Sequence, residues 1–510
     1  MMEILGNLGD GVLLSLQPLN LLLILIGVTL GLFIGAMPGL GSVNGVAILL
    51  PITFLVPPGS AIIFLAAIYY GAMYGGAISS ITLGIPGAST AVATTFDGRP
   101  LAMQGKARLA LVTAAIASFI GGTVANVFFT GFAPLLASVA LNFGPPEIFA
   151  LMLLAFATFV GLGGDDIPKT IFSICIGLVL AAVGFDEISG EPRLIFGGIS
   201  GFLHGINFLV LAIGVYGIGE MLWTIDSTRG KITTTEAEMT VKGAVEDAKT
   251  GIRRGWKGTA IGSALGFFVG ILPAAGATPG SLMAYGVAKL VSKRPDEFGK
   301  GHPSGVAAPE AANNSASTGS MLPMLTLGIP GSPTTAILLG GMVIWGLTPG
   351  PRLFTDQPEF VWGLIGSFYV SNVAAVVVNL AFIPIFIAML RMPFTILASM
   401  IFVLSVVGGY AATRDMHDVW LMLGFGFSAF MLRKLDYPLA PAVLAIVLGP
   451  IAEPTLRQSL LLSNGDPSIF ITRPIAGPIT IIAVILIFLP VFNYMRRKRK
   501  ASKASTGSGA

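Results

Sequence analysis

The sequence predicts an all-α polytopic membrane protein, with roughly 10–14 transmembrane or re-entrant helices in two inverted-topology repeats with broken helices at the midplane. Three observations predict this fold. Hydrophobic residues make up 54% of the 510-residue chain and charged residues only 11%, against about 25% charged in typical soluble domains. Apolar runs long enough to cross a bilayer recur along the chain. The hexapeptide TLGIPG occurs twice, at 82–87 and 326–331, in apolar surroundings.

The apolar runs set the expected number of helices. A bilayer-crossing helix needs roughly 20 apolar residues. Clear candidates are the runs 19–36, 107–141, 147–162, 194–222, 360–390 and 474–494. The single cysteine, Cys175, lies in another apolar run and excludes an intramolecular disulfide.

One hydrophilic interruption, 223–257, divides the chain nearly in half and carries seven basic residues. Short loops rich in Lys and Arg stay in the cytoplasm. We therefore divide the chain into a first inverted repeat (1–222), a cytoplasmic connecting loop (223–257), a second inverted repeat (258–473), an extra C-terminal helix (474–495) and a basic, disordered cytoplasmic tail (496–510). The basic tail is interpreted as a topology anchor and not as a nucleic-acid site.

The two halves share a pair of landmarks. The segment 35–41, with Pro38 near its centre, resembles the segment 270–276, with Pro273. In each half a TLGIPG follows, 48 residues from Pro38 to Pro86 and 57 residues from Pro273 to Pro330. Two helix breakers in the same order at similar spacing indicate an internal structural repeat.

The charges of matching loops indicate that the repeats are inverted. The residues before the first repeat, 1–18, are acidic, whereas the basic loop precedes the second. The segment after the first TLGIPG is basic (Arg99, Lys106, Arg108), and that after the second is acidic (Asp356, Glu359). Opposite bias places matching loops on opposite faces of the membrane. We expect a periplasmic N-terminus and a cytoplasmic C-terminus.

A helix interrupted inside the membrane exposes backbone N–H groups at its restart, and such helix starts bind anions. Two starts from inverted halves would hold a carboxylate without a buried Lys or Arg. The predicted substrate contacts are Gly84, Pro86, Gly87, Ala88, Ser89 and Thr90 in the first half, and Gly328, Pro330, Gly331, Ser332 and Thr334 in the second. The alternative is that the hydroxyls of these segments only cap the restarting helices.

The stretch 309–320 leads into the second breaker and is unusually polar for its surroundings. Its amides, Asn313 and Asn314, are further predicted substrate contacts. Candidates for a coupling ion, Na⁺ or H⁺, are Ser42, Asn44, Thr278 and Glu310. For Glu310 the favoured alternative is a residue of a solvated cytoplasmic loop. We expect no cofactor, no metal and no catalytic residues, because neither a metal-ligand spacing nor a nucleophile arrangement emerges. The missing GxxxxGK[ST] argues against ATP hydrolysis by this chain.

Several motifs together resemble the large membrane subunit of the tripartite tricarboxylate transporters. They are the segments 35–39, 70–76, 83–87, 309–314 and 325–333, with Asp186, Arg193, Gly197, Glu453 and Arg457, and the similarity extends from about 20 to 490. The resemblance implies a bacterial inner-membrane secondary transporter for organic carboxylates such as citrate, driven by an ion gradient. It implies two protein partners, a small four-helix membrane subunit and a periplasmic substrate-binding protein, besides membrane lipid, and it leaves a homodimer open. His204 departs from the acidic residue expected before Gly205.

Two other functions stay open at this point. An anion channel would use the same helix starts but would not accumulate its substrate. A membrane-embedded enzyme acting on a lipid-linked substrate would need positioned acid, base or nucleophilic residues, and the sequence offers none that convinces.

Overall fold

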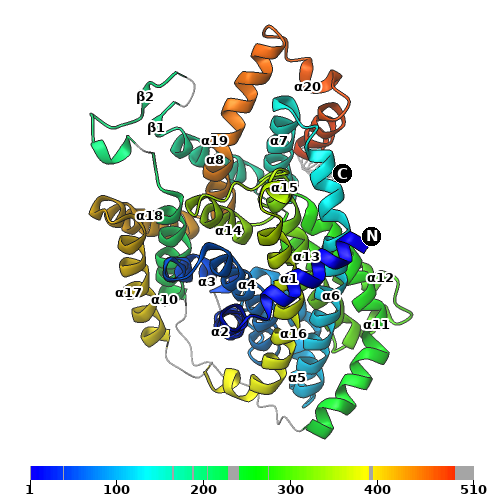
Figure 1. The fold of residues 1–510 in the computed structure, drawn as a ribbon. Coiled ribbons are helices and arrows are strands. Elements are labelled where there is room, and N and C mark those ends of the chain that lie inside the picture. Colours follow the sequence, from blue (N-terminus) through cyan, green and yellow to red (C-terminus); the bar gives the residue numbers. More distant parts are fainter. Residues whose placement is uncertain are drawn as a thin grey trace, which may run out of the picture. The chain divides into compact units, whose positions relative to one another are not determined.

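The computed structural model describes residues 2–37, 40–162, 166–186, 189–203, 205–227, 241–273, 275–389 and 394–488. Within these ranges the chain is almost wholly helical, and the short β1–β2 ribbon is the exception (Figure 1). Pro38, Gly39, His204, Ala274 and the whole predicted basic tail (496–510), all used in the sequence analysis, lie outside the described residues. The all-α polytopic class predicted from composition is confirmed.

Contacts divide the chain into two compact units: unit 1 holds residues 1–141 and 207–431, and unit 2 holds 142–206 and 432–510. Each unit therefore draws on both predicted repeats. The domain boundaries drawn from the sequence stay a prediction, apart from two corrections given below.

The elements of unit 1 fall into two series. The first is α1 (Met2–Ser15), α2 (Pro18–Ala36), α3 (Gly41–Leu49), η1 (Leu50–Leu55), α4 (Pro58–Thr82), η2 (Ser89–Ala91), α5 (Val92–Met103) and α6 (Ala107–Ala140). The second is α9 (Phe208–Ala212), the π-helical η4 (Ile213–Gly219), α10 (Glu220–Ser227), α11 (Val241–Ile271), α12 (Ala277–Leu290), η5 (Pro295–Glu297), α13 (Pro303–Leu327), α14 (Pro333–Ile344), α15 (Leu353–Asp356), α16 (Pro358–Met389), α17 (Phe394–Thr413) and α18 (Met416–Lys434, whose end passes into unit 2).

Unit 2 is smaller. It contains α7 (Pro145–Leu162), α8 (Ile167–Ala181), β1 (Gly184–Phe185), β2 (Pro192–Arg193), η3 (Ser200–Phe202), α19 (Leu439–Leu462), α20 (Ile469–Thr472) and a further apolar helix, Ala476–Phe488.

Among the described residues, five helices are long and apolar enough to span a membrane: α2, α4, α6, most of α16 and α19. Six shorter apolar helices accompany them, including Gly41–Leu55, Pro333–Ile344 and Ala476–Phe488. Short apolar helices are expected where spans are interrupted.

The close packing of α2 on α4 follows from a row of glycines. A methyl group added at Gly31 would lie 2.2 Å from the Ile68 carbonyl oxygen, and one at Gly35 would lie 2.2 Å from that of Ala72. Small residues spaced four apart let two backbones touch. Because both residue numbers rise together, α2 and α4 run parallel.

The pair α11 and α13 repeats this packing. A methyl group at Gly266 would lie 2.4 Å from the Ala312 carbonyl oxygen, and one at Gly270 would lie 2.4 Å from that of Ala316. The glycines are shifted by 235 residues (Gly35 to Gly270) and their partners by 244 (Ala72 to Ala316). The same shift of 244 relates the two TLGIPG segments.

The helices α4 and α13 pack against each other and run antiparallel. The Tyr70 hydroxyl lies 2.6 Å from the Thr318 hydroxyl, and Asn313 Nδ2 donates to the Met73 carbonyl at 3.3 Å. Higher residue numbers on α4 contact lower residue numbers on α13. These contacts place Ala72 roughly level with Ala316. The α2–α4 pair therefore runs opposite to the α11–α13 pair, and α2 and α11 end at one level.

Two boundaries from the sequence are corrected. Of the predicted span 194–222, the described residues before Phe208 form turns and a 3₁₀ segment, and α9 begins only there. Gly197, with φ +82, is one of several positions that no continuous helix could contain. The predicted loop 223–257 is also too long, because α11 is already helical from Val241.

Candidate functional site

Each TLGIPG ends a long helix, α4 or α13. The chain then turns and runs back toward the middle of that same helix. Gly84 and Gly328 have φ values of +74 and +70, the left-handed conformation that terminates α4 and α13. The chain then returns alongside the helix that it has left. A methyl group at Gly87 would lie 1.9 Å from the Gly35 carbonyl oxygen, and Gly331 N–H donates to the Ser320 carbonyl at 3.3 Å. The tips of both returns thus reach the levels at which α2 and α11 are interrupted.

At these tips four helical segments begin: α3, η2 leading into α5, α12 and α14. We call this arrangement the ring of helix starts. Ser42 of α3 lies 2.9 Å from Thr334 of α14, measured between hydroxyl oxygens. Gly276 N–H, just before α12, donates to the Gly331 carbonyl at 3.0 Å.

Two further contacts close the ring. Ser89 of η2 lies 3.0 Å from Thr278 of α12, again between hydroxyl oxygens. A methyl group at Gly41 would lie 3.2 Å from the Ala88 Cβ. The segment that follows each TLGIPG therefore contributes a hydroxyl, of Ser89 or Thr334, that contacts the interrupted helix of the other half. The positive ends of four helical segments meet at one place, and an anion is the ligand that such ends favour.

The ring is closed on one side and open on the other. Ser42, Ser332 and Thr334 are buried, and the Tyr69 hydroxyl lies 3.3 Å from both the Ser320 and Ser332 hydroxyls behind them. Ser89 is exposed and Ile85 is 45% exposed. A ligand would therefore reach the ring from the Ser89–Thr278 side.

The capping alternative applies to part of the ring. Ser332 is the N-cap of α14 and forms a reciprocal capping box with Thr335. By contrast, the hydroxyls of four other residues contact the opposite half: Ser42, Ser89, Thr278 and Thr334.

Not all predicted contacts lie at the ring. Gly84 and Gly328 form the far turns of the returns, where Gly84 faces Arg99 and Gly328 faces the Pro349 carbonyl. Pro86 and Pro330 directly precede the glycines at the tips. Thr90 lies in η2, and Asn44 is buried in α3. The assignment of these residues to a substrate stays a prediction.

Asn313 and Asn314 lie inside α13 and are fully buried. The stretch 309–320 belongs to one continuous helix, so its backbone carbonyls serve the helix, except that of Gly319, because Pro323 has no N–H to donate to it. The side-chain oxygens of both asparagines are buried without a hydrogen-bond partner. A buried, unsatisfied amide oxygen costs free energy unless a ligand, ion or water occupies it.

The interpretation of Glu310 as a solvated loop residue is wrong. Glu310 lies in α13 with 0% of its surface exposed. Thr94 of α5 donates to its Oε1 at 2.5 Å, and Ser118 of α6 donates to its Oε2 at 3.1 Å.

Asp97 is a structural residue that no sequence pattern marks. Its fully buried carboxylate accepts hydrogen bonds from the backbone N–H groups of Gly299, Gly301 and His302 at 2.7–3.0 Å, and from the Tyr285 hydroxyl at 3.0 Å. It thereby anchors α5 to the α12–α13 connection. Burial and the nearby Arg254 lower the pKa of His302, the N-cap of α13.

In unit 2 the structure brings together four residues that the sequence analysis noted separately. Arg193 makes a two-pronged ion pair with Glu453, at 2.8 and 3.1 Å, and Arg457 Nη1 lies 2.8 Å from Asp186 Oδ2. The hydrogen bonds to Glu453 raise the pKa of Arg193. This cluster holds the β1–β2 ribbon on α19.

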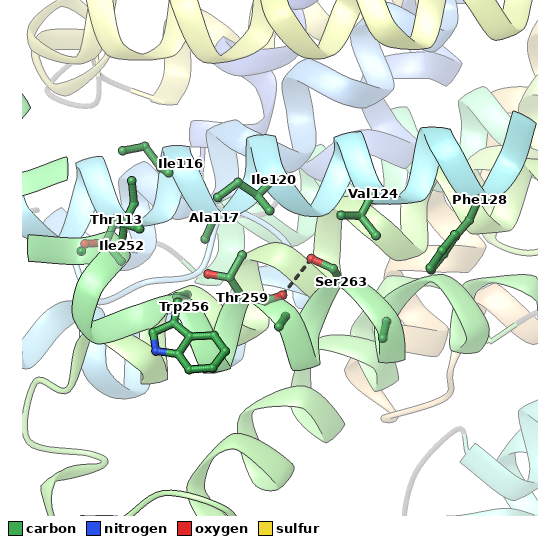
Figure 2. A pocket seen from close by; sticks show the side chains of 14 residues that line it. Thr113, Ile116, Ala117, Ile120, Val124, Phe128, Ile252, Trp256, Thr259 and Ser263 are labelled. Carbon is green, nitrogen blue, oxygen red and sulfur yellow. Dashed lines mark hydrogen bonds between the residues drawn. The ribbon is translucent and has the colours of Figure 1, made fainter. Parts of the chain in front are cut away.

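A separate cavity of about 400 Å³ lies between α6 and α11 in unit 1. Figure 2 shows Ile120, Val124 and Phe128 of α6 on one side and Trp256, Thr259 and Ser263 of α11 on the other. Its lining is largely apolar and contains no ionisable side chain. The cavity is therefore unsuited to a carboxylate, and the ring of helix starts remains the better candidate.

Interrupted helices that meet inside a polytopic, all-helical membrane protein are typical of membrane transport proteins. Comparison with known families agrees: residues 21–444 match the model of the tripartite tricarboxylate transporter TctA family. The chain belongs to this family and is thus a transporter component and not an enzyme.

Two curated relatives come from Agrobacterium vitis. An uncharacterized 52.8 kDa protein in the TAR-I ttuC′ 3′ region is 37% identical over 499 residues, which cover 98% of each chain. An uncharacterized protein in the TAR-II ttuC′ 3′ region is 37% identical over 234 residues, 46% of this chain and 97% of the relative. No solved structure matches the chain.

Proposed function

We propose that this chain is the large membrane subunit of an ion-gradient-driven secondary transporter that imports organic carboxylates, tri- or dicarboxylates such as citrate, across the bacterial inner membrane. The ring of helix starts carries this proposal. The ring brings together N–H groups and hydroxyls from both halves, and these donors can hold an anion without a lysine or arginine. A carboxylate is the organic anion that such donors fit.

The two halves are proposed to be inverted-topology repeats that alternate access to the ring. The constant shifts of 235 and 244 residues, and the antiparallel course of α4 and α13, support this proposal. Inverted repeats supply two related conformations with the site at their interface. The open Ser89–Thr278 side and the closed Ser42–Thr334 side fit one of these conformations.

The proposed orientation follows from one strongly basic end of unit 1. The starts of α6 and α11 are joined there by Arg108 and Asp247, with Nε and Oδ2 2.6 Å apart, and Gln104 reaches the Lys300 carbonyl. Basic ends face the cytoplasm. Since α13 starts at this end and α2 runs antiparallel to it, α2 would start at the periplasmic face. The tail is proposed to be cytoplasmic on its basic sequence alone.

The family is tripartite, so we propose the two partners that the resemblance implies: a small four-helix membrane subunit and a periplasmic binding protein that delivers substrate. In such a system much of the selection among carboxylates would lie in the receptor. A homodimer of the chain is a further proposal.

The test is uptake of radiolabelled citrate and a panel of dicarboxylates by cells that express all three components. We expect accumulation above the external concentration, abolished by an ionophore that collapses the ion gradients. A channel would only equilibrate its substrate. Uptake that stops at equal concentrations, with the ionophore without effect, would favour the channel and contradict the proposal.

A further inference from the structure

Glu310 is the buried acid that the ring of helix starts does not use. Its carboxylate lies in α13 among contacts from α5 and α6, and both of its oxygens accept hydroxyl hydrogen bonds. In the part of the chain that the structure describes, no cation forms an ion pair with it. An unpaired carboxyl group inside a membrane protein is costly, and such groups mark ion and proton pathways.

Other ionisable groups surround Glu310 without pairing with it. Tyr74 of α4 lies within electrostatic range, and its hydroxyl donates to Asn372. Asp97 of α5 is held by backbone N–H groups and by Tyr285 of α12. Arg99 of α5 donates to the Thr82 carbonyl, and Lys257 of α11 lies over the Trp256 ring. Arg254 of α11 and Arg108 of α6 form ion pairs with Glu297 and Asp247. His302 caps α13. The helix α14 contains no ionisable residue.

The chemistry of the two hydroxyl partners suits a proton better than a metal ion. In the structure, the Thr94 and Ser118 hydroxyls donate hydrogen bonds to the Glu310 carboxylate, which suits its ionised form. A hydroxyl both donates and accepts, so the Ser118 oxygen can accept a hydrogen bond from a protonated Glu310 without rearrangement of the backbone. The pocket is satisfied in both protonation states. No group of three or more His, Cys, Asp or Glu side chains that could hold a metal ion occurs among the described residues.

A short path connects Glu310 with the ring. Thr94 lies in the first turn of α5, and η2, with Ser89 at the ring, directly precedes that helix. The rise from Ser89 to Thr94 is roughly 9 Å. At a separation of about 10 Å and an effective dielectric constant of about 20, a negative charge on Glu310 would weaken binding of each ligand carboxylate on the order of tenfold.

We infer that Glu310 carries the coupling proton: it is protonated before or with carboxylate binding, and it releases that proton when the carboxylate leaves. The inference rests on the proposed transport function. The step moves one proton from solvent to a carboxylate oxygen and back, with no other bond changed. Because coupling is reciprocal, the proton strengthens carboxylate binding by the factor by which the carboxylate strengthens proton binding.

The first experiment compares wild type with Glu310→Gln and Glu310→Asp in reconstituted transporter, with a pH dye inside the vesicles. We expect Glu310→Gln to lose both citrate-driven proton entry and accumulation at least tenfold. Glu310→Asp, which keeps a titratable group, should restore both in part. The inference is overturned if Glu310→Gln accumulates citrate and takes up protons as well as the wild type does. It is also overturned if the wild type requires Na⁺ and takes up no protons.

If Glu310→Gln does not transport at all, a second experiment tests the inference by binding alone. Citrate binding to the purified proteins is measured between pH 5.5 and 8.5. Both proteins experience the ionisation of citrate itself, so the variant is the matched control. We expect the wild-type affinity to rise about tenfold more than that of the variant on acidification, and equal pH dependence overturns the inference. If wild type neither binds nor accumulates any carboxylate of the panel, it is the proposed function that fails.

Discussion

The hydroxyl oxygens of Ser42 and Thr334 lie 2.9 Å apart in a buried site, although 292 residues separate them in the chain. The contact joins α3, in the interrupted helix of the first half, to α14, which begins just after the TLGIPG of the second. Removing one hydroxyl leaves the other unpaired, which costs about 1–3 kcal/mol, whereas removing both is less costly than the two losses added.

We therefore expect Ser42→Ala and Thr334→Val each to lower the thermal unfolding midpoint in detergent, and the double variant to lower it by less than the sum. Thr29→Val is the control, because the Thr29 hydroxyl bonds only within its own helix, to the Leu25 carbonyl. Strictly additive shifts would show that the two hydroxyls do not interact in solution.

Gly87→Leu and Gly331→Leu should abolish uptake while the protein remains inserted in the membrane. The reason is steric: a Cβ at Gly87 would lie 1.9 Å from the Gly35 carbonyl oxygen, and one at Gly331 would lie 2.7 Å from the Ser320 backbone. Each return would be forced away from the ring.

The matched control is Gly131→Leu in α6, where an added Cβ meets nothing within 4 Å. Citrate uptake and membrane insertion are measured for all three variants. Wild-type uptake in both TLGIPG variants would contradict the arrangement of the ring.

Asp97→Asn should strongly destabilise unit 1. The substitution replaces charge-assisted hydrogen bonds, each worth about 1.5–3 kcal/mol, by weaker neutral ones, and it introduces an amide N–H₂ among backbone donors. We expect a clear fall in the unfolding midpoint, about the size of losing one such bond. Asp356→Asn, at an exposed carboxylate, is the control and should be nearly neutral. Equal midpoints for the two variants would contradict the anchoring role of Asp97.

The paired helix breakers were visible in the sequence because TLGIPG is repeated with its neighbours at similar spacing. Asp97 was not recognised, because its partners are backbone N–H groups near residue 300 and no residue type marks them. Glu310 was misplaced for a related reason. A polar stretch between apolar runs is typical of a loop, and only the hydroxyls of Thr94 and Ser118, about 200 residues away, make its burial in a helix tolerable.

The stability of the α13 start should depend on pH through His302. Its Nδ1 accepts the Ser304 N–H at 3.1 Å, which requires that nitrogen to be unprotonated. Burial and Arg254 lower its pKa below the ordinary value of about 6.5. The neutral form therefore contributes stability that is present above pH 6.5 and is lost as the pH falls through the folded-state pKa.

Unfolding midpoints of wild type and His302→Asn between pH 8 and 5 measure this effect. Asparagine keeps an N-cap acceptor but does not titrate. We expect a smaller acid-induced fall in the variant. Identical pH profiles would show that His302 does not contribute.

The most direct test of the ring as the carboxylate site is protection of Ser89 from a thiol reagent. In a Cys175→Ser background, which removes the single native thiol, Ser89→Cys is labelled with a water-soluble maleimide with and without the carboxylate that the preparation accumulates. We expect the carboxylate to slow labelling of Ser89→Cys, with half-protection at the concentration that half-saturates uptake. Labelling of Ser468→Cys, exposed in unit 2, should not change. Unchanged labelling of Ser89→Cys at a saturating concentration, in a preparation that still transports, would contradict a substrate site at the four helix starts.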